Sequence, residues 1–489
     1  MNFSLSKEIK VVLPRFLLML FLYIIYCIIR DLRESVILSS NASGAEVIPF
    51  LKLWAMLPAA IFFTALFSKL SNRFGTEVST YLICSAYLAY FIIFAFWIFP
   101  QLEQFILSDL SVTLKKSLPS GFYGFVDMIC NWPLSIFYVL SGTWATIVVS
   151  LLYWGCINQI SSPKEASSSY GILKIGGTLS AVLAGLLASF FQQSQYNPRL
   201  PFGKNAWEQT IMNETALVGL LGISSLFLFR LIYCSGNKTE TIKKKKLSFS
   251  LTKSLSVLAQ SRYLVCIAVL VFGFTFIYDL CDVLWKAQLK AALEDPNLIM
   301  QYLNKITMII GTVSIVATLC SSMIIEKFGW KTLAIITPLT VLFSGFGFFV
   351  LLLASKTLDP YCMSFFGMSS VALSIFMGAL QSCLGRAAKY SVFDVSKEIA
   401  FTPLDSEESW NGKTAIDGIG NDVARVSAAS VHQVAIIAFG NIMFSAPAVV
   451  GIILMYLLLW IWAVDDAAKT FDHLTGKKTS PQILEEAKA

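Results

Sequence analysis

Long apolar runs, each bounded by charged or turn-forming residues, follow one another along almost the whole chain. A helix needs roughly twenty apolar residues to cross the hydrocarbon core of a bilayer, and about twelve runs reach that length. The pattern therefore predicts an all-α membrane protein of about twelve transmembrane helices. The expected spans are 11–30, 46–68, 77–99, 133–158, 165–190, 213–234, 262–284, 304–325, 331–354, 362–385, 420–442 and 445–465.

The loops between these spans differ in basic charge, which predicts their orientation. Lys and Arg gather in alternate loops, most densely in the lysine run 243–246, and cytoplasmic loops carry such an excess. We therefore expect both termini in the cytoplasm, which requires an even number of spans. The first apolar run is too long for a signal peptide and continues into the charged segment 30–34 without a cleavage site.

The order of the spans divides the chain into two similar halves. A basic loop separates them, as in transporters of the major facilitator type, which this layout resembles. The cytoplasmic turn 72–75 reads Asn-Arg-Phe-Gly, and the turn 326–329 at the equivalent place of the second half reads Glu-Lys-Phe-Gly. We predict an N-terminal half at 1–234, a linker at 235–261, a C-terminal half at 262–466 and a cytoplasmic tail at 467–489, with a substrate site near the midplane between the halves.

Composition excludes several other classes of protein. Hydrophobic residues make up 56% of the 489 residues and charged residues only 14%, whereas soluble proteins carry about 25%. The net charge of +7 reflects the cytoplasmic loops, so we expect no nucleic-acid partner. The ten cysteines form no C-x-x-C pair, and no phosphate-binding glycine loop is present. We therefore expect neither a metal site nor a cofactor.

Ionisable residues inside the expected spans point to a polar pathway. Each costs about 2.5–3.5 kcal/mol on insertion scales. Asp282 and Lys286 lie four residues apart, so they share a helix face, as Arg30 and Glu34 do. Structural ion pairs and snorkelling side chains are the alternative, and His432 fits a packing role or a proton relay. The excess of cations favours an organic anion as the transported solute.

Several motifs, in order, resemble those of the ATP/ADP antiporter family of plastids and of obligate intracellular bacteria such as chlamydiae. They are Arg-Asp-Leu-Arg-Glu at 30–34, Gly-Ala-Glu-Val-Ile-Pro-Phe-Leu-Lys-Leu-Trp at 44–54, Trp-Gly-Cys-Ile-Asn-Gln-Ile at 154–160, Asp-Val-Leu-Trp-Lys-Ala-Gln-Leu-Lys at 282–290, Lys-Tyr-Ser-Val-Phe-Asp at 389–394, Pro-Leu-Asp at 403–405 and Gly-Lys-Thr-Ala-Ile-Asp at 412–417. The resemblance implies nucleotide transport, with ATP-for-ADP exchange as its main form. The repeat of mitochondrial carriers is absent from the sequence.

The charged residues of the spans and the resemblance together suggest a substrate site. Arg33, Lys52, Lys286 and Arg425 would oppose the phosphate charge of a nucleotide, and Glu165 and Asp282 would pair with these cations in the empty site or carry a coupled proton. Coupling or gating would involve a second set, Glu34, Asp279, Asp422 and His432. The family usually has Lys in place of Arg33 and Glu in place of Asp282, and segments 166–170 and 421–425 also depart from its pattern.

These departures leave other transport modes open. Proton-coupled import of GTP, UTP or CTP, and exchange of NAD for ADP, remain alternatives. A membrane transferase is disfavoured because the chain has only two histidines and no D-D-x-x-D motif. We therefore expect a transporter and not an enzyme, acting as a monomer in the inner membrane of a bacterium, with a nucleotide and the lipid bilayer as its partners.

Overall fold

The computed structural model describes the chain except for residues 1, 41–43, 161–162, 236–250 and 477–489. Every described element is helical, and the described residues contain no β-strand. The chain forms two compact units. Unit 1 comprises Met1–Lys244 together with Leu289–Thr312, and unit 2 comprises Lys245–Gln288 together with Val313–Ala489. Most of the expected linker 235–261 and of the expected tail 467–489 lies outside the described residues.

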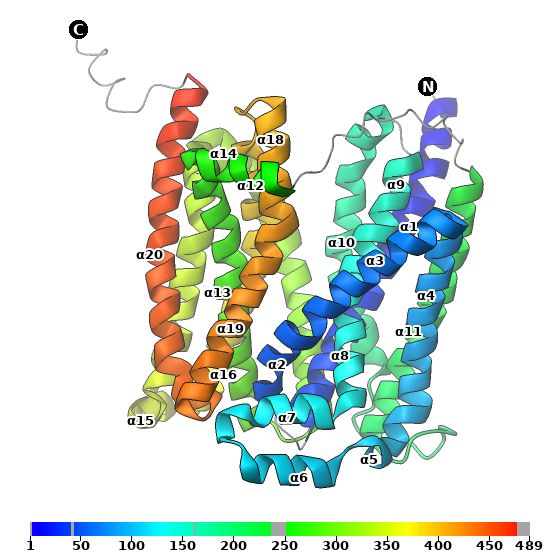
Figure 1. The fold of residues 1–489 in the computed structure, drawn as a ribbon, viewed down its shortest axis with the longest axis vertical. Helices are drawn as coiled ribbons and strands as arrows, with labels where there is room; N and C mark the ends of the chain where they lie inside the picture. The colour runs from blue at the N-terminus through cyan, green and yellow to red at the C-terminus, as the bar shows by residue number, and fades with distance from the viewer. Residues whose placement is uncertain (1, 41–43, 161–162, 236–250, 477–489) are drawn as a thin grey trace. The chain divides into compact units, whose positions relative to one another are not determined.

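Unit 1 is a bundle of long helices with short helical segments at one end (Figure 1). Its α-helices are α1 (Asn2–Ser39), α2 (Val47–Phe50), α3 (Leu57–Phe74), α4 (Thr76–Ile93), α5 (Leu102–Phe105), α6 (Ser108–Ser117), α7 (Tyr123–Cys130), α8 (Trp132–Trp144), α9 (Trp154–Ile160), α10 (Pro163–Phe191), α11 (Ala206–Ser235) and the first part of α14 (Pro296–Leu353). Short 3-10 turns η1 (Gly44–Glu46), η4 (Phe99–Gln101) and η5 (Ser120–Phe122) and π-helical segments η2 (Leu51–Met56), η3 (Phe94–Ile98) and η6 (Ala145–Tyr153) complete it.

Helix α1 is the centre of unit 1. It packs against α8, α10 and α11, and most of its side chains from Leu18 to Leu38 are buried. Two aromatic side chains fix it to the neighbouring span, because Trp144 Nε1 donates to the carbonyl of Leu22 at 3.1 Å and Tyr153 donates to the carbonyl of Arg15 at 3.1 Å. The charged segment at 30–34 is therefore held inside a bundle.

Unit 2 is a second bundle, with α12 lying across one end of it (Figure 1). Its helices are α12 (Leu251–Gln260), α13 (Arg262–Ala292), the second part of α14, α15 (Ser355–Phe366), α16 (Ser370–Ala388), α17 (Asp394–Ala400), α18 (Ser406–Lys413), α19 (Asn421–Phe439) and α20 (Ile442–Leu474), with π-helical segments η7 (Lys389–Phe393) and η8 (Thr414–Gly420). Trp460 is fully buried and packs edge-on against Phe274 and Phe393.

The two turns of the sequence repeat have the same backbone conformation. Gly75 ends α3 with φ 82 and ψ 161, and Gly329 interrupts α14 with φ 79 and ψ 179. Only glycine adopts this region readily. A Cβ at either position would meet nothing within 4 Å, so the backbone conformation and not crowding accounts for the glycine. Helix α14 is therefore two helices joined at Gly329, as the separate spans 304–325 and 331–354 required.

The expected spans correspond to described helices, with corrections in two places. Ten of the described helices are long and apolar enough to cross a membrane. The expected spans 165–190 and 420–442 fall on α10 and α19, which carry more polar residues. The expected start at 362 is wrong, because Gly367 ends α15 with φ 65 and Ser369 caps α16.

The polar segment 389–420, between the expected spans 362–385 and 420–442, is largely helical. Segments η7 and α17 continue α16 as far as Ala400, and α18 and η8 lead into α19. Its serines are accommodated by hydrogen bonds to their own helix. Ser391 donates to the carbonyl of Ala387 at 2.6 Å, and Ser396 donates to that of Phe393 at 2.9 Å.

Candidate substrate site

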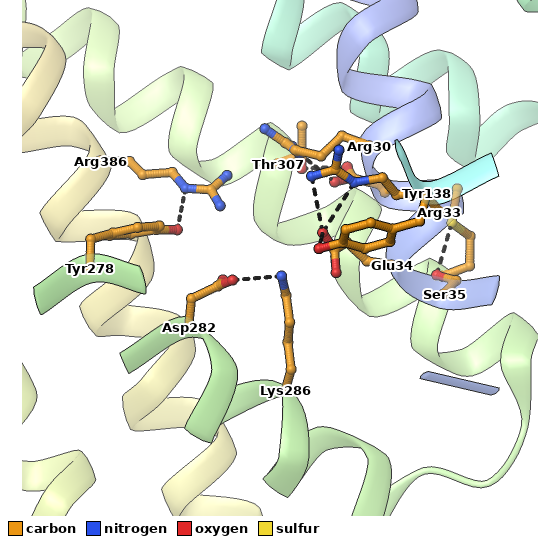
Figure 2. A network of polar contacts seen from close by, with 12 residues as sticks. Arg30, Arg33, Glu34, Ser35, Tyr138, Tyr278, Asp282, Lys286, Thr307 and Arg386 are labelled. Atoms are coloured by element: carbon orange, nitrogen blue, oxygen red, sulfur yellow. Dashed lines mark hydrogen bonds and ion pairs between the residues drawn. The ribbon is translucent and has the colours of Figure 1, made fainter. Parts of the chain in front are cut away.

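In unit 1, α1 carries a buried charge network at the level of Arg30. Arg30 Nε contacts Asp31 Oδ1 at 2.9 Å, and Arg30 Nη2 donates to Thr307 Oγ1 at 2.6 Å (Figure 2). Thr307 in turn donates to Asp31 Oδ2 at 2.5 Å. Helix α14 thus supplies the hydroxyl that completes the pair. Arg30 therefore pairs with its sequence neighbour Asp31, whereas the four-residue spacing had suggested a pair with Glu34.

Arg33 forms a second network one turn further along α1. Its Nε and Nη2 atoms both contact Glu34 Oε1 at 3.2 Å, and Tyr138 of α8 donates to the same oxygen at 3.4 Å. The guanidinium carbon lies 4.7 Å from the centre of the Tyr138 ring. The remaining nitrogen, Nη1, is buried and makes no hydrogen bond to any described residue. Arg33 therefore has one donor nitrogen available for a further acceptor.

A glycine on α8 makes room for this guanidinium. A Cβ built on Gly142 would lie 2.7 Å from Arg33 Nη1 and 2.5 Å from Met56 Cε. Both distances are shorter than any ordinary carbon contact, so residue 142 must lack a side chain for Arg33 to adopt this position. Gly142 thus belongs to the site although it carries no functional group, and sequence reasoning did not single it out.

In unit 2, the pair predicted on α13 is present. Lys286 Nζ lies 2.6 Å from Asp282 Oδ2, and both residues are 5% exposed (Figure 2). Trp285 fixes this face of α13, because its Nε1 donates to the carbonyl of Ile375 at 3.1 Å. Its ring packs so closely on α16 that a Cβ at Gly378 would lie 2.3 Å from it. The helix can therefore neither rotate nor shift freely around this ion pair.

Two further cations of unit 2 lie beside α13, and the sequence analysis did not single out either as a site residue. Arg386 of α16 donates from Nε to the hydroxyl of Tyr278, and its guanidinium lies 5.1 Å from the centre of that ring. Lys389 lies 5.2 Å from the centre of the Phe274 ring and interacts electrostatically with Asp279. The signal in the sequence was their place at the end of an apolar run, where Lys389 begins the motif 389–394.

Two other lysines of unit 2 form ion pairs with acidic side chains. Lys397 contacts Asp417 at 2.8 Å, and Lys413 contacts Glu398. These four residues lie in or beside η7, η8 and the short helices between them. Single π-helical turns inside α-helices are frequent at functional sites, because they re-aim side chains. Segment η7 begins at Lys389 itself, and η2 of unit 1 contains Lys52.

The other expected site residues have more varied surroundings. Lys52 is half-buried in η2. Arg425 and Asp422 form an exposed pair at 3.4 Å on α19, and Asp279 is half-buried. His432 is 1% exposed, and its Nε2 lies 3.1 Å from the carbonyl of Leu280.

That contact of His432 with a backbone carbonyl fits the packing alternative better than the proton relay. Glu165 lies on α10, but its side chain is outside the described residues. No cluster of three metal-ligating side chains occurs among the described residues.

Comparisons with known proteins agree over nearly the full length. The family described as TLC ATP/ADP transporter matches residues 4–471. ADP,ATP carrier protein 2 of Chlamydia pneumoniae is 31% identical, over 95% of this chain and 89% of that protein. The plastidic ATP/ADP-transporter of Solanum tuberosum is also 31% identical, over 94% of this chain and 73% of that protein.

Solved structures with this fold are major-facilitator-like transporters, which confirms the expected architecture. A D-xylose-proton symporter has a TM-score of 0.56 at 15% identity, covering 93% of this chain and 96% of its own. The nucleoside transporter NupG has a TM-score of 0.52 at 12% identity, with coverage of 94% and 99%. The matches over this length, together with the spans, settle the assignment: the chain belongs to the TLC ATP/ADP transporter family and is a multi-pass membrane protein.

Proposed function

We propose that the chain exchanges ATP for ADP across the inner membrane of a bacterium. It acts as a transporter and not as an enzyme, as a monomer with both termini in the cytoplasm. The proposal rests on the family, whose matched members are named as ADP,ATP carriers. Each unit contributes buried cations, which is the chemistry that a phosphate chain requires.

The observation that carries the proposal is the free nitrogen of Arg33. A buried guanidinium nitrogen without an acceptor costs free energy, because the polar group has lost its water. An arriving phosphate oxygen would remove this cost and form a charge-assisted hydrogen bond. Glu34 meanwhile holds the other two nitrogens at 3.2 Å, so the guanidinium is already oriented before the substrate binds.

The second unit supports the same chemistry with a different arrangement. Lys286, Arg386 and Lys389 lie on the α13–α16 side of unit 2, within reach of one aromatic or acidic partner each. We infer that phosphate oxygens compete with Asp282 for Lys286. An empty site then carries neutralised pairs, and a loaded site carries cations paired with the substrate.

Two of the departures from the family pattern are compatible with exchange. Arg33 replaces the usual Lys, but a guanidinium also binds phosphate and keeps its charge at all relevant pH values. Asp282 replaces the usual Glu and still reaches Lys286 at 2.6 Å. Both substitutions preserve the charge and the contact that the role needs.

The experiment is exchange into liposomes that contain the purified chain and internal ADP. External labelled ATP should enter whether or not a protonophore is present, and GTP, UTP, CTP and NAD should compete weakly. Arg33→Ala should reduce exchange at least about tenfold, because a hydrogen bond to a charged group contributes about 1.5–3 kcal/mol.

The matched control is Arg73→Ala, which removes an exposed arginine of the same unit and should leave exchange unchanged. Wild-type exchange by Arg33→Ala would exclude this site. Uptake that collapses with the protonophore, or that is limited to another nucleotide, would exclude ATP/ADP exchange itself.

A further inference from the structure

Unit 1 contains a buried carboxyl group that the nucleotide site does not use. Glu214 lies on α11 and is 0% exposed. Neither of its carboxyl oxygens makes a hydrogen bond of good geometry to any described residue. The neighbouring polar side chains of α11 behave differently, since Gln209 and Asn213 each donate to a backbone carbonyl. Glu214 is therefore an exception within its own helix.

Glu214 lies near Asp31 of α1 and the amide of Asn304 on α14. Its burial and the carboxylate of Asp31 disfavour its ionised form, because a buried charge has lost its water and like charges repel. Segment η3, which follows α4, and the end of α10 at 183–191 also pack against α11 and contain no ionisable residue. Among the described residues, the charged group that acts most strongly on Glu214 is therefore another carboxylate.

A protonated carboxyl would fit this surrounding. The amide of Asn304 is 1% exposed, and neither its oxygen nor its nitrogen makes a hydrogen bond of good geometry to a described residue. A carboxylic acid and a primary amide are complementary, because the acid O–H donates to the amide oxygen while the amide N–H donates to the acid carbonyl. A carboxylate can satisfy only half of that pair and leaves the amide oxygen without a donor.

Helix α14 connects this pair to the charge network of α1. Asn304 and Thr307 lie three residues apart, so they occupy one face of the helix. Thr307 bridges Arg30 and Asp31 on α1, one turn from Arg33. A change in the hydrogen bonding or the position of Asn304 would therefore reach the proposed nucleotide-binding residues of α1.

We propose that Glu214 and Asn304 form a proton-binding site, and that its occupancy controls nucleotide exchange through the Asn304–Thr307 face of α14. One proton binds a Glu214 carboxylate oxygen, and the acid then pairs with the Asn304 amide. Release of the proton leaves a carboxylate close to Asp31, and the repulsion loosens α11 from α1 and α14. The control of exchange rests on the proposed function, whereas the proton site does not.

The proton site is tested without nucleotide. Infrared difference spectra between acidic and alkaline pH are recorded for the wild-type chain in liposomes, for Glu214→Gln and for the control Glu208→Gln. Glu208 lies on the same helix, where it accepts from the backbone of Lys204 at the protein surface. We expect the carbonyl band of a protonated carboxyl in the wild-type chain and in the control, and its loss in Glu214→Gln. An unchanged band in Glu214→Gln would overturn the site.

The coupling is tested by the pH dependence of exchange. Above the titration of Glu214 the protonated fraction falls about tenfold per pH unit, so wild-type exchange should fall by a similar factor. Glu214→Gln, which mimics the protonated acid, should keep the rate of the acidic range at all pH values. A wild-type pH profile in this variant would overturn the coupling.

A variant that keeps an ionisable group covers the case in which Glu214→Gln does not insert. Glu214→Asp shortens the side chain by one methylene, which moves the carboxyl away from Asn304. We expect the midpoint of both the infrared titration and the exchange profile to shift together. Midpoints identical to those of the wild-type chain would overturn the proposal. A chain that exchanges no nucleotide but shows the infrared result would refute the proposed function and leave the proton site intact.

Discussion

Replacing Gly142 by alanine should weaken nucleotide binding while the chain still folds. The new Cβ would lie 2.7 Å from Arg33 Nη1, and ordinary contact begins at 3.4 Å, so the nitrogen must withdraw by about 0.7 Å (3.4 − 2.7). Met56 Cε, at 2.5 Å, must move as well. Both atoms are the ends of flexible side chains, so the fold can relax around the substitution at no more than about 1–3 kcal/mol.

Nucleotide binding is weakened because the displaced atom is the nitrogen available for phosphate. Removing a hydrogen bond to a charged group costs about 1.5–3 kcal/mol, which corresponds to a roughly tenfold to hundredfold weaker affinity for ATP. Gly155→Ala is the matched control, since it lies on the same span and a Cβ there would meet nothing within 4 Å. That variant should bind ATP as the wild-type chain does.

The assay measures the concentration dependence of ATP exchange in liposomes, with melting temperature in detergent as the readout of folding. A double variant adds a sharper test, because Gly142→Ala should have no further effect once Arg33 is alanine. A wild-type affinity for ATP in Gly142→Ala would refute the reasoning. So would an equal loss of ATP affinity when Gly142→Ala is introduced into the wild-type chain and into Arg33→Ala.

Three further predictions concern unit 2. Arg386→Gln should lower exchange at least about tenfold, whereas Lys331→Gln, which removes a 53% exposed side chain, should leave the exchange rate unchanged. Asp282→Asn should lower stability by about 3 kcal/mol, since it leaves the Lys286 ammonium buried, and Asp282→Asn with Lys286→Met should restore the melting temperature but not exchange.

At the start of α16, the backbone N–H and the hydroxyl of Ser370 both donate to the carboxylate of Asp359. These hydrogen bonds lower the pKa of Asp359. The ionised Asp359 carboxylate therefore stabilises the fold fully above the pKa that this residue has in the unfolded chain. This contribution is lost as pH falls through its pKa in the folded chain. Between neutral and acidic pH, the melting temperature of Asp359→Asn should fall less than that of the wild-type chain. An equal fall in both chains would contradict this.

The sequence predicted what depends on local pattern. Apolar runs gave the spans, and the four-residue spacing gave the Asp282–Lys286 pair, because both follow from the geometry of one helix. Arg386 and Lys389 were missed because they follow the end of an apolar run, where cations commonly face water. Only the tertiary packing against Tyr278 and Phe274 shows that they lie inside the bundle.

Glu214 was missed for a related reason. It lies at the edge of the expected span 213–234, where a carboxylate is ordinary, and its burial comes from α1 and α14, which are far away in the sequence. The grouping of Leu289–Thr312 with unit 1 is equally non-local. The predicted division into halves at 1–234 and 262–466, and a site between them, stay predictions.

In both units, a carboxylate on the same helix pairs with a buried cation. A site for nucleotide phosphates needs several cations, and each unpaired cation inside a membrane protein raises the cost of the empty state. Arg33 and Lys286 each have a carboxylate on the same helix, next in sequence for Arg33 and four residues earlier for Lys286. In the proposed site these carboxylates stabilise the empty state, and they act differently once a phosphate arrives: Glu34 keeps Arg33 oriented, whereas Asp282 competes with the phosphate for Lys286. Binding at Lys286 then exchanges one ion pair for another, so the net gain is modest, and a bound nucleotide can leave on the other side of the membrane.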